Sequence, residues 1–246
     1  MGFSKSSLMA VLTASLVMLF GSACAQSPAK QPTPAELYGQ ATELAAEGRQ
    51  REAVAALRKA VDAGFNGLGQ LYNDKALDPL RDDPQFKSMV MQVRKRVFPC
   101  ETDPRHRQFD FWAGNWDVFM ANGNKAGENR IEIVEKGCVL EELWTGSAGG
   151  TGRSLNYYDP AKDRWVQQWV SSGGLIINIE GGLDDDGSMA MTGTSYYTTT
   201  GKQNAFRGLW TLLEDGRVRQ FFEESYDGGE TWSPWFEGFY VPRPSP

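Results

Sequence analysis

All eight tryptophans of this 246-residue chain lie after position 100. The stretch from 33 to 97 contains none, and its alanines and leucines recur at helical spacing. After position 100, apolar and polar residues alternate in short segments broken by glycines, which is typical of β-strands. The two stretches follow different packing periods, so we predict a helical module over 34–99 and a strand-rich module over 100–246.

The N-terminal 25 residues have the pattern of an export signal. Lys5 supplies the positive start, and the apolar run from Leu8 to Phe20 is too short to span a bilayer comfortably. Ala23-Cys24-Ala25 is an A-x-A cleavage signature. The mature chain is therefore predicted to begin at Gln26, with a polar linker over 26–33, and to be periplasmic or secreted.

A second interpretation of the same segment is a lipoprotein signal. Gly21-Ser22-Ala23-Cys24 resembles a bacterial lipobox, in which Cys24 would be lipidated and would anchor the protein to a membrane. The leucine-like first residue of that motif is replaced by Gly21. No later segment reaches the roughly 18 continuous apolar residues of a transmembrane helix, so no transmembrane span is expected.

Two cysteines remain after the signal, Cys100 and Cys138. In an oxidising compartment they are predicted to form a disulfide that ties the start of the second module to a strand 38 positions later. The alternative is a pair of separate buried thiols.

The charge of the chain is unevenly distributed. Residues 34–99 carry 10 Lys/Arg against 9 Asp/Glu, whereas residues 100–246 carry 13 against 22, a balance of −9. An acidic module without a basic stripe is a poor binder of nucleic acid or anionic lipid. Nucleic-acid partners are therefore excluded.

The helical module begins with a capping-box pattern, Thr33-Pro34-Ala35-Glu36. Small and large residues then recur as in a tetratricopeptide repeat, which the stretch 34–67 resembles. These residues are Leu37, Ala41, Leu44, Gly48, Ala53, Leu57 and Ala60. The usual aromatic residues are absent, and Phe65 stands where the family often has proline. The resemblance implies a helix pair with its turn at Gly48.

Further helix starts follow this pair. Asp78-Pro79 and Asp83-Pro84 each combine a capping residue with proline, and a last helix is predicted over 84–97, with a short helical turn near Leu71. The helical module is predicted either to cap the second module or to dock a protein or peptide partner.

The strand-rich module is predicted to hold about ten antiparallel strands, closed into a barrel or, alternatively, folded as a β-sandwich. Hairpin signals such as Asn122-Gly123 and Lys136-Gly137 separate the alternating segments. Later strands are expected at 174–181, 188–194, 204–213, 217–226 and 231–241. The fold class of the whole chain is therefore α+β.

Two motifs in this module resemble those of calycin-type barrels, the group that includes lipocalins, fatty-acid-binding proteins and uncharacterised secreted bacterial domains. They are Phe111-Trp112-Ala113-Gly114-Asn115-Trp116-Asp117 and Gly137-Cys138-Val139-Leu140-Glu141-Glu142-Leu143-Trp144. The resemblance covers about 105–243 and implies a ligand cavity without naming the ligand. Some related barrels bind haem through a late-strand histidine. This chain has only His106, before the first strand, so neither haem nor any other cofactor is predicted.

The alternating faces predict which side chains line that cavity. The ligand-binding candidates are Leu140, Glu142, Trp144, Trp165, Gln167, Trp169, Phe206 and Trp210. The leading hypothesis is an exported protein that binds an apolar or aromatic small molecule, and a protein-interaction scaffold is an alternative.

A barrel enzyme, a hydrolase or isomerase, is the other alternative, and it is less favoured. Its weak catalytic candidates are Glu142 and Glu224, which lie on strand faces shared with apolar residues. Buried glutamates would have a raised pKa and could donate protons, whereas glutamates at strand ends or facing outward would not. A single histidine excludes a metal site built on two or three histidines, and no metal site is predicted.

Three segments that contain glycine are interpreted as turns. Residues 146–153 lack the spacing and the lysine of a phosphate-binding loop, and are expected to form a hairpin at the barrel mouth. Residues 225–232 match a single Asp-box, a structural hairpin tip. Residues 184–187 do not have the spacing of a calcium-binding EF-hand loop and are expected to form a solvated turn.

Overall fold

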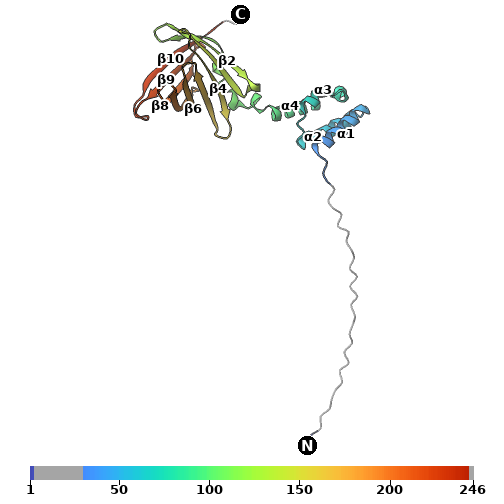
Figure 1. Cartoon of the computed structure of the whole chain (residues 1–246). Coiled ribbons are helices and arrows are strands. Elements are labelled where there is room, and N and C mark those ends of the chain that lie inside the picture. The colour runs from blue at the N-terminus through green and yellow to red at the C-terminus, as the bar shows by residue number, and fades with distance from the viewer. Residues whose placement is uncertain (3–29, 244–246) are drawn as a thin grey trace.

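The computed structural model describes residues 1–2 and 30–243. The predicted export signal, its cleavage site, the alternative lipidation at Cys24 and the first part of the 26–33 linker fall outside the described residues. The described chain contains helices up to residue 112 and a closed β-barrel after it. Figure 1 shows helices α1–α4 to one side of the barrel, joined to it through short helices.

Four α-helices and one 3₁₀ helix form the first part of the chain. They are α1 (Pro34–Ala46), α2 (Gln50–Asp62), α3 (Leu68–Asn73), the 3₁₀ helix η1 (Lys75–Leu80) and α4 (Pro84–Val97). The predicted capping box is confirmed: the Glu36 amide donates to Oγ1 of Thr33 at 3.2 Å, and the Thr33 amide donates to Oε2 of Glu36 at 2.6 Å. Asp83 caps α4 through Oδ1, which accepts from the amides of Gln85 at 2.6 Å and Phe86 at 3.2 Å, so the predicted 84–97 helix is also confirmed.

The helix pair turns at Gly48, whose φ of +76° favours glycine. Ala41, Ala53 and Ala60 are fully buried where α1 and α2 meet, because their small side chains allow close approach. Leu57 fills the seam beside them. The helices share one apolar cluster that contains no residue of the barrel.

Three short 3₁₀ helices connect α4 to the barrel. They are η2 (Pro99–Glu101), η3 (Pro104–Arg107) and η4 (Asp110–Trp112).

The barrel contains ten antiparallel strands in a closed ring, which confirms the barrel prediction and shows that the β-sandwich alternative is wrong. The strands are β1 (Gly114–Met120), β2 (Lys125–Val134), β3 (Val139–Gly146), β4 (Thr151–Asp159), β5 (Arg164–Ser171), β6 (Leu175–Leu183), β7 (Met189–Tyr197), β8 (Lys202–Leu212), β9 (Val218–Ser225) and β10 (Ser233–Pro242). Each strand pairs with its sequence neighbours, and β1 pairs with β10 to close the ring. A fifth 3₁₀ helix, η5 (Glu135–Gly137), separates β2 from β3.

One end of the barrel is filled with aromatic rings from the chain just before β1. Phe109 and Trp112 are fully buried and stack with ring centroids 5.0 Å apart. Phe109 also meets the edge of Trp210 at 5.3 Å and of Trp165 at 5.7 Å. Helices α1–α4 contribute no side chain to this apolar cluster within the described residues. The segment before β1 therefore fills this end of the barrel, which is called the closed end below.

Candidate functional site

The opposite end of the barrel holds a cavity of about 130 Å³. It lies toward the β3–β4, β5–β6 and β9–β10 turns, because its lining residues come from the matching ends of those strands. The lining consists of six aromatic side chains, one isoleucine, one glutamate and two glutamines. These are Trp144, Trp169, Phe222, Trp235, Phe236, Ile177, Glu142, Gln167, Gln220 and Tyr240.

Glycines on the inner face of the barrel make room for the cavity walls. A Cβ added at Gly152 would lie 2.1 Å from the ring of Trp169, and one added at Gly127 would lie 2.8 Å from the ring of Trp144. The rings therefore lie directly against backbone at these two places. A larger residue would displace the ring toward the barrel interior.

A chain of hydrogen bonds forms the polar floor of the cavity. The Leu140 carbonyl can only accept, so it fixes the Asn156 amide nitrogen, which donates to it at 3.1 Å. Asn156 Oδ1 must then accept, and Gln167 Nε2 donates to it at 2.7 Å. On its other side, Asn156 Nδ2 donates to Ser154 Oγ at 2.8 Å. Ser154 Oγ in turn donates to Glu142 Oε2 at 2.6 Å.

The same network continues across β2, β10 and β9. Asn129 Nδ2 donates to Glu142 Oε1 at 2.7 Å and lies 3.2 Å from the hydroxyl of Tyr240. That hydroxyl donates to Gln220 Oε1. These hydrogen-bonded side chains form the polar floor of the cavity, whereas on β8 and β9 the cavity-wall ring of Phe222 directly contacts the core ring of Trp210 at 5.1 Å.

Glu142 is the ionisable group at the centre of this network. It is 4% exposed, and burial raises its pKa to about 7, although the hydrogen bonds from Ser154 and Asn129 act in the opposite direction. A carboxyl group with this pKa changes its charge near neutral pH. It can therefore act as a proton donor or acceptor, or as a charge that responds to a ligand.

Glu224 lies in a second polar cluster on β9. Burial acts to raise its pKa, but hydrogen bonds from Ser195 and Asn204 and from the hydroxyl of Tyr197 together hold the pKa below its usual value. Tyr197 also accepts a hydrogen bond from Nε1 of Trp235 at 3.1 Å, which links this cluster to a cavity wall. Both glutamates are buried, Glu142 in the middle of β3 and Glu224 one residue before the end of β9. The raised pKa expected of a buried glutamate is found for Glu142 but not for Glu224.

The predicted ligand-binding residues fall into two groups. Glu142, Trp144, Gln167 and Trp169 line the cavity. The other four, Leu140, Trp165, Phe206 and Trp210, are buried in the apolar core and do not line it. Alternation along the strands identified the inward face, but it did not show how far toward the filled end each residue lies.

Sequence reasoning did not single out several members of the site. Asn129, Ser154 and Asn156 are polar residues on inward faces, and Gln220 and Tyr240 face them from β9 and β10. A signal was present in the sequence, because polar residues recur at inward positions of β2, β4 and β5 next to Glu142. The glycines under the rings were a second signal.

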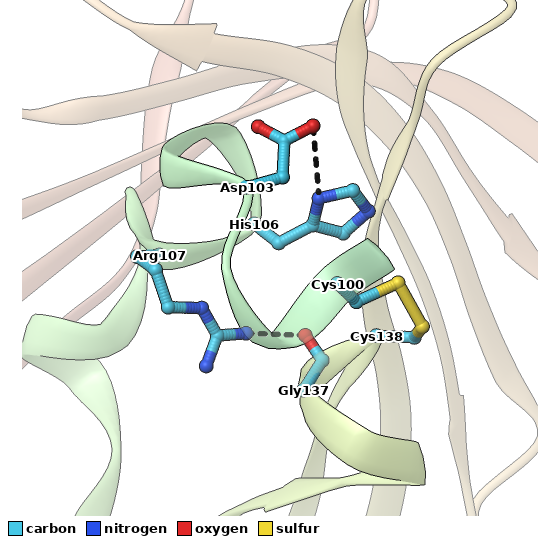
Figure 2. The surroundings of a disulfide bond; sticks show 6 residues. All are labelled: Cys100, Asp103, His106, Arg107, Gly137 and Cys138. Atoms are coloured by element: carbon cyan, nitrogen blue, oxygen red, sulfur yellow. Dashed lines mark hydrogen bonds and ion pairs between the residues drawn. A yellow bond between two sulfur atoms is a disulfide. The ribbon is translucent and has the colours of Figure 1, made fainter. Parts of the chain in front are cut away.

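The disulfide and its surroundings hold the connecting segment to the barrel (Figure 2). The predicted cysteine pair, Cys100 and Cys138, lies at bonding distance, with Cα atoms 4.9 Å apart. Arg107 donates to the Gly137 carbonyl beside it. His106 is buried, with Nδ1 3.8 Å from Asp103 Oδ2, and burial lowers the pKa of this imidazole.

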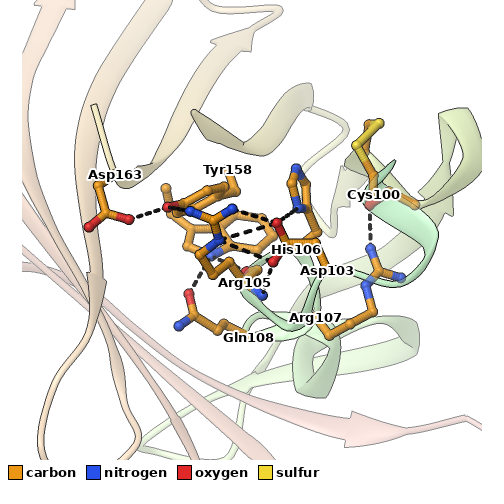
Figure 3. Close-up of polar contacts among 11 residues, drawn as sticks. Cys100, Asp103, Arg105, His106, Arg107, Gln108, Tyr158 and Asp163 are labelled. Carbon is orange, nitrogen blue, oxygen red and sulfur yellow. Dashed lines mark hydrogen bonds and ion pairs between the residues drawn. A yellow bond between two sulfur atoms is a disulfide. The ribbon is translucent and has the colours of Figure 1, made fainter. Parts of the chain in front are cut away.

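Figure 3 shows how the same segment is anchored to β4 and β5. The guanidinium of Arg105 donates to the carboxylate of Asp103 and, at 3.1 Å, to the hydroxyl of Tyr158. Nε1 of Trp165 donates to Gln108 Oε1 at 3.1 Å. These contacts position Phe109 and Trp112 in the closed end of the barrel. The segment from Asp103 to Gln108 therefore has a structural role: it holds the chain before β1 against β4 and β5.

The three glycine-containing segments adopt turns. Residues 147–150 connect β3 and β4 at the cavity end of the barrel. In the Asp-box, the Thr231 amide donates to Asp227 at 2.9 Å, and this contact fixes the β9–β10 turn. Among the described residues, no group of three or more His, Cys, Asp or Glu side chains is arranged to hold a metal ion.

A larger hollow of about 800 Å³ is lined by residues of β1–β5 and by Arg243, and it includes the inward-facing Asn129 and Trp144. The guanidinium groups of Arg130, Arg153 and Arg243 each lie within 3.7 Å of a carboxylate. An anionic ligand would compete with these carboxylates, so the aromatic cavity is the better candidate site.

A scan against models of protein families finds no match to this sequence, and a search of curated proteins finds none either. The assignment of function therefore depends on the geometry of the site. No helix in the part of the chain that the structure describes has the length and apolar character needed to cross a membrane.

Proposed function

We propose that the barrel binds a small apolar or aromatic molecule in its aromatic cavity. This cavity lies at the end opposite Phe109 and Trp112, which is called the open end below. The observation that carries this proposal is the cavity itself, whose volume is about 130 Å³ and whose lining contains six aromatic side chains. An apolar protein cavity of about 150 Å³ is large enough to hold benzene. The volume therefore suits a single ring, with any substituent directed at the polar floor.

Two glycines in one hairpin provide a matched test. Gly152→Ala would push the Trp169 ring into the cavity, whereas a Cβ at Gly150 meets no atom within 4 Å. Titration with single-ring lipophilic compounds, followed by tryptophan fluorescence, should show binding to the wild type and to Gly150→Ala. Gly152→Ala should bind at least about tenfold more weakly because the site is filled. Equal binding by both variants would place the ligand elsewhere.

The natural ligand can be sought without choosing a compound. Native mass spectrometry of the protein purified from its own host should show an added small mass that Gly152→Ala loses. If the wild type carries no added mass and also binds no single-ring compound, the proposed function fails.

A second candidate function is a barrel hydrolase or isomerase. The observation that favours it is the pKa of about 7 for Glu142, a cavity-lining group suited to general acid–base catalysis near neutral pH. Replacing both Glu142 and Glu224 with glutamine should abolish any turnover without unfolding the barrel. Unchanged turnover would exclude both residues.

Export to the periplasm or the cell exterior is part of the proposal. The Cys100–Cys138 disulfide supports it, because such bonds persist in oxidising compartments. N-terminal analysis of the mature protein should find Gln26, whereas a lipid-modified Cys24 would establish the anchored alternative.

The tetratricopeptide-like character of 34–67 and partner docking by the helices are also proposals. Tyr72 and Met91 are about half exposed beside a hollow of about 320 Å³ on α3 and α4, which supports docking. A partner captured by the full chain should be lost on Met91→Glu and retained on Lys59→Glu, a substitution on α2.

A further inference from the structure

The floor of the aromatic cavity contains an acidic group, Glu142, which forms no ion pair with a lysine, arginine or histidine among the described residues. Glu142 is buried, and none of the ten residues that line the cavity is lysine, arginine or histidine. Its carboxyl contacts the amide of Asn129 and the hydroxyl of Ser154. The only titratable group that shares these partners is Tyr240, whose phenol stays neutral because burial raises its pKa well above the ordinary value.

The hydrogen bonds around Glu142 suit its anionic form. Oε1 accepts from Asn129, and Oε2 accepts from Ser154, so neither bond needs a proton on the carboxyl. Each carboxylate oxygen can accept two hydrogen bonds, which leaves two acceptor positions unused. The site is therefore arranged around a negative charge but lacks the matching positive charge.

A second acceptor lies on the same cavity floor. Because the Leu140 carbonyl fixes the orientation of Asn156, Gln167 must direct Nε2 at Asn156 Oδ1. The other terminal atom of this cavity-lining side chain, Oε1, then accepts no hydrogen bond within the described residues. A hydroxyl has one hydrogen to donate, whereas an ammonium has three and carries a positive charge, so an ammonium can satisfy both Gln167 and Glu142.

The walls of the cavity favour the same ligand chemistry. The faces of aromatic rings attract cations, with tryptophan the strongest, and the attraction is greater where water is excluded. Trp144, Trp169 and Phe222 stand around the polar floor. Gln220 accepts from Tyr240 through Oε1, so its Nε2 can donate to a ligand, but an anionic ligand would find no positive charge among the lining residues and would be repelled by ionised Glu142.

We infer that the cavity recognises a small organic ammonium ion that carries one apolar or aromatic group. The ammonium donates to Glu142 and to Oε1 of Gln167, while the apolar group lies among Trp144, Trp169 and Phe222. This inference rests on the proposed function and specifies its ligand class.

Three compounds with the same ring and chain length test the inference: 2-phenylethylamine, 2-phenylethanol and phenylacetate. Calorimetric titration of the full mature chain at about pH 8 should rank the amine at least about tenfold tighter than the alcohol, because a charged hydrogen-bonded pair is added. Phenylacetate should bind most weakly. The advantage of the amine should shrink toward pH 6, as Glu142 takes up a proton.

Glu142→Gln removes the charge and keeps the shape of the side chain. The new amide can donate to Ser154 Oγ while its oxygen accepts from Asn129, so the variant is expected to fold. It should bind the alcohol as the wild type does but lose the preference for the amine. Glu141→Gln, the adjacent residue on the outer face, removes the same charge and should keep the preference.

The outcomes separate the two claims. If no compound binds, the proposed function fails together with the inference. If the amine and the alcohol bind equally, if phenylacetate binds best, or if Glu142→Gln keeps the preference for the amine, the cavity still binds ligand but the inference is overturned.

Discussion

The two ends of the barrel use the same kind of residue for different purposes. At the closed end, aromatic rings lie against other rings: Phe109 stacks on Trp112 and meets Trp210 and Trp165 at their edges. At the open end, rings also contact rings, as Trp144 does Phe236, but a cavity remains between the walls. The comparison shows that tryptophan content alone does not identify a ligand site. Phe109 and Trp112, from the segment before β1, fill one end of the barrel, and the cavity lies at the other.

The largest effect is expected from removing a ring at the closed end. Trp210→Ala deletes a fully buried side chain and should lower the free energy of unfolding of the barrel by about 3–5 kcal/mol. Denaturant unfolding followed by tryptophan fluorescence reports this module alone, because every tryptophan lies after residue 100. A loss below about 1 kcal/mol would show that this end is not tightly packed.

Reducing the Cys100–Cys138 disulfide should have the next largest effect. The bond closes a loop of 38 positions, so its loss should cost about 3–4 kcal/mol of barrel stability in the chain-entropy model. Because the bond lies far from the cavity end, ligand affinity should stay unchanged in the Cys100→Ala/Cys138→Ala variant. A large loss of affinity without unfolding would mean that the two ends are coupled.

The stability of the barrel should depend on pH in a way set by Glu142, which lies on the cavity floor between the two ends. Glu142 keeps its proton in the folded barrel up to about pH 7, whereas the unfolded chain releases it near the ordinary value of 4.5. Between these values the unfolded state binds fewer protons, so stability falls as the pH rises. Relative to Glu142→Gln, the wild type should lose on the order of 2–3 kcal/mol from about pH 5 to pH 8.

Glu224→Gln is the control for that titration. The pKa of Glu224 lies below its usual value, so the stability it contributes is present above the unfolded pKa and is lost only at lower pH. The stability difference between wild type and Glu224→Gln should therefore be flat from about pH 5 to pH 8. The account would be contradicted if the stability difference between wild type and Glu224→Gln changed over this pH range. It would also be contradicted if the difference between wild type and Glu142→Gln did not change.

The smallest effect is expected at the cavity rim. Trp235 is 39% exposed and has one hydrogen bond, to Tyr197, so Trp235→Ala should cost about 1 kcal/mol of stability or less. Ligand affinity should fall more than stability does, because the ring forms part of the cavity wall. If Trp235→Ala instead lost more stability than ligand affinity, both in kcal/mol, the open end would be packed like the closed one.

Much of the fold follows from local patterns in the sequence. The Thr33–Glu36 capping box, the Gly48 turn and the alternation of the strands each have a local physical cause, and the structure contains all three. The depth of each side chain inside the barrel has no such local cause. It depends on the stagger of all ten strands and on the insertion of Phe109 and Trp112.

The same limit applies to the candidate site. Alternation placed Trp144, Trp165, Trp169 and Trp210 on inward faces, but only Trp144 and Trp169 line the cavity. The sequence left open whether Glu142 is buried, because its hydrogen-bond partners come from strands whose register is set by the closed ring.

Nuclear magnetic resonance of the indole N–H groups tests the difference between the two ends most directly. On addition of 2-phenylethanol or 2-phenylethylamine to saturation, the signals of Trp144, Trp169 and Trp235 should shift. Those of Trp112, Trp165 and Trp210 should stay in place. Shifts confined to the closed-end tryptophans, or no shift at any tryptophan, would contradict a ligand cavity at the open end.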